Sequence, residues 1–322
     1  MTEVLHSIIG NSCKVTGVYI DDNGTFPLSM LNLHRENELS LKRKKVNYNI
    51  NITVAGNTKT ISINTNYNTS IYNIYMILGE ILRFENLFEG CFFNITSFKL
   101  NEKEYLNTID KYILSYFKSN KTYTRFNFSY SNNEYRRLYF KWKKLEKNLN
   151  IIHPVFLFST FIKGMTADVN MAQLLQVFEP IAEKLHHEGK IVLTKQPFIT
   201  FSEKCPSCGT LVSKSVPNKS LYFSDKLKPV MDRYGKDIFK GDSNKKIIEK
   251  AIGIRNKVDH VKATRKKVMS GGQCGFYIQK FSLLYRYIIL LELELEETEL
   301  NKKIVEWTKQ YNNQFPNLRI KY

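Results

Sequence analysis

The spacing of apolar residues changes near residue 134, and this change constrains the fold more than any other feature of the sequence. Before it, residues 46–54 alternate strictly between apolar side chains and Asn or Thr, which is the period of a strand with one buried face. Gly56 and Asn57 tolerate positive φ, and the alternation resumes at residues 60–63, so this stretch predicts a hairpin. Residues 92–100 and 126–130 favour further strands. We therefore predict a β-rich N-terminal domain at residues 1–133.

After residue 134, apolar residues recur at helical spacing. Residues 135–149 and 154–163 are two short helix candidates. Asp168 is placed to cap a longer helix, whose apolar face extends to Leu185. The next stretch, residues 188–220, is polar and interrupted by prolines, which predicts a long irregular insertion between helices.

Two strong helices follow the insertion. Asp242 or Ser243 can cap the first one, and its single apolar seam consists of Ile247, Ala251, Ile254, Val258 and Val261. The second helix spans residues 277–295, and residues 270–272 predict a flexible glycine-rich break between the two. The expected fold class is therefore α+β, with an all-α helical bundle at residues 134–322 after the β-rich domain.

Composition indicates a folded protein that attracts polyanions. Hydrophobic residues make up 43% of the chain, with 21 Phe and 19 Tyr, which excludes a disordered or fibrous protein. The formal net charge of +18 favours binding to nucleic acid, because each Lys or Arg set against a phosphate releases counterions. An AT-rich genome, which also enriches Lys, Asn, Ile and Tyr, explains the same composition without any ligand.

The sequence also predicts where the protein works. Its first residues lack a basic stretch followed by an apolar run, so we expect no secretory signal and a mature chain that starts at Met1. The longest apolar stretch, residues 276–291, contains charged residues and is too short to cross a bilayer. Five cysteines without framework spacing fit reduced thiols. We expect a cytoplasmic protein that does not bind membranes.

One helix carries three residues that suit phosphodiester chemistry. Asn256 and His260 are four positions apart and share a face of the helix opened near Asp242, whereas Arg255 lies roughly 140° away from His260 and reaches around with its long side chain. Histidine exchanges protons near neutral pH, and arginine offers a planar fork of donors to phosphate oxygens. Asn256 can hold the imidazole or contact the phosphate.

RNA cleavage without a metal needs groups of these types and little else, because the 2′-hydroxyl already lies beside the scissile phosphate. A single Arg and a single His are few groups for deprotonating the 2′-hydroxyl and assisting the leaving 5′-oxygen. Two copies around a two-fold axis double the set, so we expect a homodimer or a higher even oligomer. Basic residues that follow would contact flanking phosphates. They are Lys257, Lys262, Arg265, Lys266 and Lys267.

The motif and its setting resemble the HEPN superfamily, whose hallmark is R-x4-6-H with a polar residue directly after the Arg. Arg255, Asn256 and His260 match that motif position by position, over a resemblance that covers about residues 150–300. The layout resembles ApeA-type anti-phage abortive-infection proteins, although the N-terminal half is short for that type. The resemblance implies an endoribonuclease that halts growth of infected cells, with transfer RNA among its substrates, a sensing or regulatory N-terminal domain and a phage-derived trigger.

Two other functions fit the same residues. An Arg and a His on a charged helix are usually solvated, so the bundle could be inactive and the basic surface could only hold or sense nucleic acid. Alternatively, the chain is the ribonuclease toxin of a toxin–antitoxin pair, restrained by a separate partner. His260→Ala separates an enzyme from a binder, and the neighbouring genes identify an antitoxin.

Cys205 and Cys208, spaced C-x2-C with Pro206 and Gly209, resemble one half of a zinc site. A tetrahedral site needs two more ligands, and the candidates are His186, His187 and Cys274, or the same cysteine pair from another subunit. Any zinc here would be structural, since catalysis requires no cofactor in this scheme. The alternative is a loop with two reduced thiols.

Overall fold

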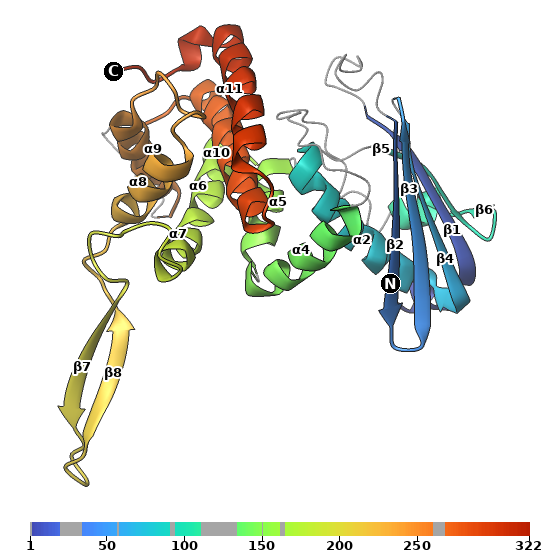
Figure 1. Cartoon of the computed structure of the whole chain (residues 1–322), viewed down its shortest axis with the longest axis horizontal. Helices are drawn as coiled ribbons and strands as arrows, with labels where there is room; N and C mark the ends of the chain where they lie inside the picture. The colour runs from blue at the N-terminus through green and yellow to red at the C-terminus, as the bar shows by residue number, and fades with distance from the viewer. Residues whose placement is uncertain are drawn as a thin grey trace. The chain divides into compact units, whose positions relative to one another are not determined.

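The structure of the chain is a computed structural model that describes residues 2–19, 34–56, 58–90, 94–110, 134–149, 151–161, 165–259 and 268–322. They form two compact units, Met1–Met165 with Ile289–Lys303 and Thr166–Ile288 with Ile304–Tyr322 (Figure 1). An N-terminal sheet precedes a mainly helical C-terminal part, which confirms the α+β class. The strand predicted at residues 126–130 lies outside the described residues.

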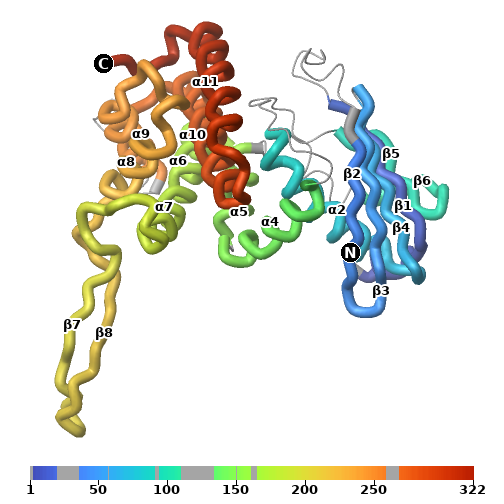
Figure 2. Tube along the Cα trace, in the orientation of Figure 1, coloured from blue at the N-terminus to red at the C-terminus, as the bar shows by residue number. Residues whose placement is uncertain are grey.

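Within the described residues, the first unit is built on a six-stranded sheet in the order β2-β3-β4-β1-β5-β6. The strands are β1 (Ile9–Val18), β2 (His34–Arg43), β3 (Val46–Ala55), β4 (Thr58–Ser70), β5 (Asn94–Leu100) and β6 (Lys103–Glu104). Figure 2 follows the chain through β2, β3 and β4, which pair as antiparallel neighbours.

The hairpin predicted around Gly56 is confirmed. Ala55 pairs with Thr58 across the turn, and Gly56 has a φ of 56°, the left-handed region that glycine adopts without strain. Alternate residues of β3 from Tyr48 to Val54 are buried, while the Asn residues between them are exposed or half-buried. The strict alternation in the sequence therefore reports one face of the sheet packed against the core.

Helix α2 (Ile71–Glu89) was not predicted, although it is the main cover of the sheet. It packs against β1 and β4 and is buried over most of its length. The Ser70 side chain caps its first turn by accepting from the Asn73 backbone N–H, and Gly90 ends it in the left-handed conformation at φ 66°. Helices α1 (Thr2–Ser7) and α3 (Leu106–Asp110) complete this part of the unit.

A buried ion cluster joins α2 to the sheet. The Lys59 ammonium on β4 is fully buried and pairs with Glu85 and with Glu89 Oε1, the latter at 2.9 Å. The Tyr19 hydroxyl donates to the same Glu89 oxygen at 2.8 Å. Because a buried charge without a partner costs several kcal/mol, this cluster fixes the position of α2 on the strands.

Helices α4 (Tyr135–Leu149) and α5 (Ile152–Phe161) confirm the two predicted short helices and belong to the first unit. Trp142 of α4 lies against Phe84 of α2 and against His153 of α5, with ring centroids 5.5 and 6.1 Å apart. His153 also stacks on Phe156 at 5.8 Å. Aromatic packing therefore holds these helices on α2.

We expect His153 to make the stability of this unit depend on pH. Burial lowers its pKa from 6.5 to about 3, so the unfolded chain takes up a proton that the folded chain refuses. The free energy of unfolding should fall by about 1.4 kcal/mol per pH unit between about pH 6 and pH 4. Urea denaturation of wild type and His153→Gln at several pH values measures this contribution. An equal pH slope in both proteins would contradict it.

The second unit is built from helices. They are α6 (Ala167–Gln176), α7 (Phe178–His187), α8 (Phe223–Tyr234) and α9 (Asn244–Asp259), with α10 (Gly271–Glu292) and α11 (Glu297–Gln314) contributing to both units. A 3-10 turn, η4 (Pro316–Leu318), follows. Residues 276–288 of α10 are all buried, including the charged Lys280 and Arg286, so this helix lies in the centre of its surroundings. No described helix combines the length and the apolarity needed to cross a membrane.

The helix predicted after Asp168 is two helices, and its cap is Thr166 instead of Asp168. Pro180 has no N–H and cannot donate to the carbonyl of Gln176. Helix α6 therefore ends at Gln176. Val177 separates α6 from α7. The break predicted at residues 270–272 is instead the start of α10, where Ser270 and Gln273 exchange hydrogen bonds in a capping box.

We predicted an irregular insertion at residues 188–220, and this prediction is wrong, because the insertion contains a hairpin. Strands β7 (Phe198–Lys204) and β8 (Leu211–Pro217) pair antiparallel from Phe198↔Pro217 to Lys204↔Leu211. The hairpin extends away from the adjacent helices α7 and α8 (Figure 1). Its residues are almost all exposed, so neither face is buried. The sequence therefore lacks the alternation of apolar and polar residues that predicts a strand.

Candidate functional site

Helix α9 places the predicted site residues on its surface. Ser243 caps it, with the Ile247 backbone N–H bonded to the Ser243 carbonyl at 2.9 Å. Ile247, Ala251 and Ile254 are fully buried, which confirms most of the predicted seam, whereas Val258 is only half-buried. Since α9 packs on α6 and α8 through this seam, Arg255, Asn256 and Lys257 lie toward the outside.

Arg255 is held by groups from two other helices. Its Nη1 forms an ion pair with Glu179 Oε1 of α7. Its guanidinium also lies over the Phe223 ring of α8, 4.9 Å from the centroid. The Arg255 side chain retains 24% exposure. The planar fork is therefore oriented by a carboxylate and an aromatic face while part of it remains accessible to a phosphate.

Glu179 is shared between two cations. Its second oxygen accepts from the Lys226 ammonium at 3.3 Å, and Glu183 accepts from the same ammonium at 2.7 Å. Partial burial lowers the pKa of Lys226, but the two carboxylates outweigh this and raise it above its usual value. The acidic residues on α7 thus balance the charges of Arg255 and Lys226, which lets the four side chains pack together.

Asn256 and Lys257 follow Arg255 and are exposed. The Lys257 ammonium donates to Asp168 Oδ2 of α6 at 3.0 Å. The Thr166 hydroxyl and the Lys257 ammonium hold the pKa of Asp168 below its usual value. Lys257 retains 45% exposure of its side chain, so this pair leaves the ammonium open to a second anion.

His260, the third member of the motif, lies outside the described residues. So do four of the five predicted phosphate contacts, Lys262, Arg265, Lys266 and Lys267, and the seam residue Val261. The placement of these side chains relative to Arg255 stays a prediction that rests on the sequence.

Two residues of the site were missed or underspecified from the sequence. No sequence pattern indicated that Glu179 is the partner of Arg255. Phe223 was not considered, because α8 was not predicted and Pro229 interrupts its pattern. The signal that identifies α8 is the helical spacing of its buried residues Leu227, Val230, Met231 and Tyr234.

Cys205 and Cys208 lie at the turn of the β7–β8 hairpin, but the other candidate ligands do not join them. Cys274 is buried in α10, and the His186 ring contacts the Ile191 carbonyl and Gln196. Among the described residues, no three His, Cys, Asp or Glu side chains gather closely enough to hold a metal ion. The hydroxyl of Thr210 contacts Cys208 Sγ at 3.0 Å, and its hydrogen bond lowers the pKa of that thiol.

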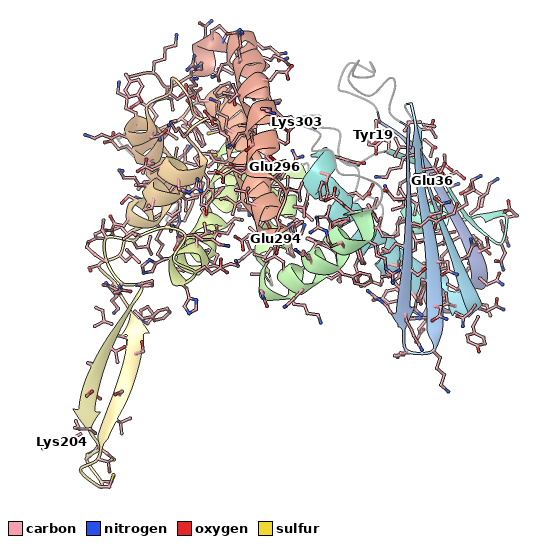
Figure 3. All side chains as sticks on the ribbon, in the orientation of Figure 1. Tyr19, Glu36, Lys204, Glu294, Glu296 and Lys303 are labelled. Atoms are coloured by element: carbon pink, nitrogen blue, oxygen red, sulfur yellow. The ribbon has the colours of Figure 1, made fainter. Side chains whose placement is uncertain are left out.

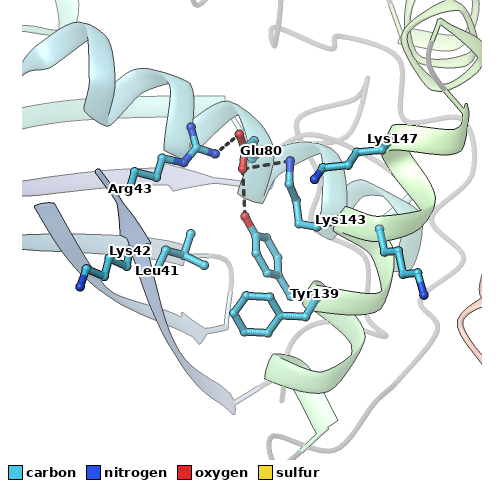
Figure 4. Close-up of a pocket in the computed structure, with 9 residues that line it drawn as sticks. Leu41, Lys42, Arg43, Glu80, Tyr139, Lys143 and Lys147 are labelled. Carbon is cyan, nitrogen blue, oxygen red and sulfur yellow. Dashed lines mark hydrogen bonds and ion pairs between the residues drawn. The ribbon is translucent and has the colours of Figure 1, made fainter. Parts of the chain in front are cut away.

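The first unit contains a basic pocket of about 350 Å³ between β2, α2 and α4 (Figure 4). It is lined by Leu41, Lys42, Arg43, Glu80, Tyr139, Phe140, Lys143, Lys144 and Lys147. Glu80 accepts from the Tyr139 hydroxyl at 3.1 Å and pairs with Arg43 and Lys143. Burial raises the pKa of Glu80, but the two cations outweigh it and keep the carboxyl ionised. The remaining lysines give the pocket an excess of positive charge, which favours anions.

Comparison with known families assigns part of the chain. Residues 181–299 match the family model described as Apea-like HEPN. The matched range contains the β7–β8 hairpin, α8, α9 and α10, and it includes the motif residues from Arg255 to His260. Neither the curated proteins nor the solved structures contain a significant match to the chain.

Proposed function

Residues 181–299 of this chain are an Apea-like HEPN domain, and from this premise we propose that the protein cleaves RNA without a metal ion, at a site containing Arg255, Asn256 and His260. The match suggests a family of anti-phage defence nucleases. The proposed role is abortive infection: cleavage of host RNA, with transfer RNA as a candidate substrate, stops growth of the infected cell.

The arrangement around Arg255 is the observation that carries the proposal. Its guanidinium is oriented by Glu179 and Phe223 and is still partly exposed on the same helix as Asn256. An arginine needed only for packing requires no accessible donors. Pre-oriented donors stabilise the charge that develops on a phosphorane-like transition state, because they need not reorganise during the reaction.

The remaining steps are proton transfers. His260 accepts the proton of the 2′-hydroxyl, or donates one to the leaving 5′-oxygen, and Asn256 orients the imidazole or the phosphate. The 2′-oxygen bonds to phosphorus as the bond to the 5′-oxygen breaks. The products are a 2′,3′-cyclic phosphate and a 5′-hydroxyl.

A second copy of the chain completes the proposed site. One imidazole cannot remove a proton from the nucleophile and supply one to the leaving group in the same step. A two-fold axis that brings α9 of two protomers together provides a second Arg255 and a second His260 in one cleft. We therefore propose a homodimer, or a higher even oligomer, as the active form.

Expression of wild type and His260→Ala in cells, with sequencing of RNA ends, tests the proposed function. We expect discrete new RNA ends and arrested growth with wild type only, while both proteins bind RNA. Growth that is affected equally by both proteins, without new RNA ends in either, would contradict it and favour a nucleic-acid-binding protein with an inactive bundle.

We also predict that Glu179 is a positioning residue for Arg255. Glu179→Ala should lower kcat by about 10–10²-fold, since misplacement of a catalytic group by about 1 Å has effects of this size. Glu179→Asp should restore part of kcat. Glu183→Ala is the matched control, because Glu183 lies on the same helix and pairs with Lys226, whereas Glu179 pairs with Arg255. Equal losses of kcat in Glu179→Ala and Glu183→Ala would refute the role of Glu179.

A further inference from the structure

The turn of the β7–β8 hairpin brings two thiols together. The Gly209 backbone N–H donates to the Cys205 carbonyl at 2.8 Å, and the Cys205 backbone N–H donates to the Thr210 carbonyl at 2.8 Å. Gly209 has a φ of +71°, which a residue with a side chain rarely adopts. Cys208 Sγ lies 3.0 Å from the Thr210 hydroxyl in the same turn. This closed turn therefore keeps the two cysteines near each other at the end of the hairpin, and two such thiolates can bind a soft metal ion.

Two thiolates are half of a structural zinc site. Zn²⁺ in such sites is bound tetrahedrally by four Cys or His ligands. In the described part of the chain, no third His, Cys, Asp or Glu approaches the pair, and Cys274 is enclosed in α10. Two ligands must therefore come from outside this arrangement.

The strands of the hairpin expose large apolar side chains on both faces. On one face, Ile199, Phe201 and Val212 are 49%, 36% and 54% exposed, beside the charged Glu203 and Lys214. On the other face, Phe198 and Leu211 are 54% and 66% exposed, and the Ser202 and Ser213 hydroxyls contact each other. Since isolated two-stranded hairpins are only marginally stable, a partner that covers these apolar side chains would stabilise this one.

We propose that two copies of this chain join through their hairpins, so that Cys205 and Cys208 from each copy bind one Zn²⁺ between them. A two-fold axis through the metal supplies four sulfurs, two from each copy, which no single copy provides among its described residues. The same association can cover exposed apolar side chains of both hairpins. On binding, each thiol releases its proton to the solvent, and four thiolates around Zn²⁺ leave a net charge of −2.

Nearby lysines offset this charge. Lys204 directly precedes Cys205 and lies near the free end of the hairpin (Figure 3). Lys214 on β8 pairs with Phe201 across the strands and is also exposed. These two lysines therefore bring positive charge to the same hairpin as the negatively charged metal site.

Metal content of the full-length protein is the first test. We expect one Zn²⁺ per two chains. Titration of the metal-free protein with Co²⁺ should produce thiolate-to-cobalt absorption that saturates at the same ratio. Cys208→Ser should lose both signals, whereas Ser207→Ala, in the same turn, and Cys274→Ser, in α10, should keep them. One metal ion per chain, or no tightly bound metal, would overturn the proposal.

Self-association is the second test and does not depend on RNA cleavage. A chelator, or Cys208→Ser, should raise the dissociation constant for association at least tenfold by sedimentation velocity. Phe201→Ser with Val212→Ser keeps the thiols but should also weaken association by about tenfold, as loss of an apolar anchor does. Association that is unaffected by chelator would contradict the shared site, even in a protein that cleaves RNA.

Discussion

Replacing Arg255 with alanine should lower kcat/KM for RNA cleavage by about 10²–10³-fold, the usual loss when one oriented donor to a developing negative charge is removed. The loss should appear mainly in kcat, because the guanidinium acts on the transition state more than on the bound RNA. Arg255→Lys should recover little, since an ammonium lacks the planar fork that Glu179 and Phe223 orient.

The matched control for this variant is Lys245→Ala. Lys245 is exposed in the first turn of α9, on the order of 15 Å along the helix from Arg255, and its removal deletes one positive charge from the same element. Single-turnover kinetics on a short RNA, with binding measured separately, distinguish the two variants. If Lys245→Ala lost as much activity as Arg255→Ala, general electrostatic attraction would explain the effect and the specific role would be wrong.

Asp242→Ala should lower the free energy of unfolding by about 3–5 kcal/mol, because it leaves a buried charge without its partner. The Lys280 ammonium and the Asp242 carboxylate are both fully buried and lie 2.5 Å apart. Burial lowers the pKa of Lys280 to about 8 despite the nearby carboxylate. Removing the proton from a lysine of ordinary pKa at pH 7 costs about 4.8 kcal/mol, so the loss should not exceed that amount.

A second partner broadens the effect of the Asp242 substitution. Arg319 Nε donates to Asp242 Oδ1 at 2.8 Å, and Asp242 immediately precedes the cap of α9. Asp242→Ala should therefore loosen the C-terminal segment as well as α9. Urea denaturation measures the change, and Asp242→Asn combined with Lys280→Met should recover much of the lost stability. A double variant as unstable as Asp242→Ala would contradict the buried charge as the cause.

The periodic elements were predictable because local sequence alone fixes them. The strict alternation of residues 46–54 and the turn at Gly56 correspond to β3 and its hairpin with β4. The amphipathic pattern of residues 135–149 gave α4 with the bounds observed. In each case one face of the element is buried and the other is exposed to solvent. Apolar residues then recur at the spacing of a strand or a helix, and that spacing can be recognised in the sequence.

Other elements escaped prediction because long-range packing determines them. Helix α2 is buried around most of its surface, so its sequence lacks a polar face. The β7–β8 hairpin lacks a buried face, since nearly all of it is exposed. In α8, Pro229 lies within a helix that tertiary contacts nevertheless maintain.

The candidate site also contains residues that local sequence identifies and contacts that only tertiary packing determines. Arg255 and Asn256 were identifiable, because their types and spacing on one helix carry chemical meaning. The contact of Arg255 with Glu179 joins two helices that are far apart in the sequence. No local sequence pattern predicts that these two side chains lie next to each other. The contact with Phe223 required knowledge of α8.

The chemistry of the RNA ends tests the central claim most directly. Purified protein is incubated with a defined RNA in buffer without Mg²⁺ and, in parallel, with Mg²⁺, and the products are analysed by mass spectrometry. Cleavage that proceeds equally without Mg²⁺ and leaves 2′,3′-cyclic phosphate and 5′-hydroxyl ends, and that is lost in Arg255→Ala, is the predicted result. Cleavage that requires Mg²⁺, or that leaves 3′-hydroxyl and 5′-phosphate ends, would contradict a site built from Arg255 and His260.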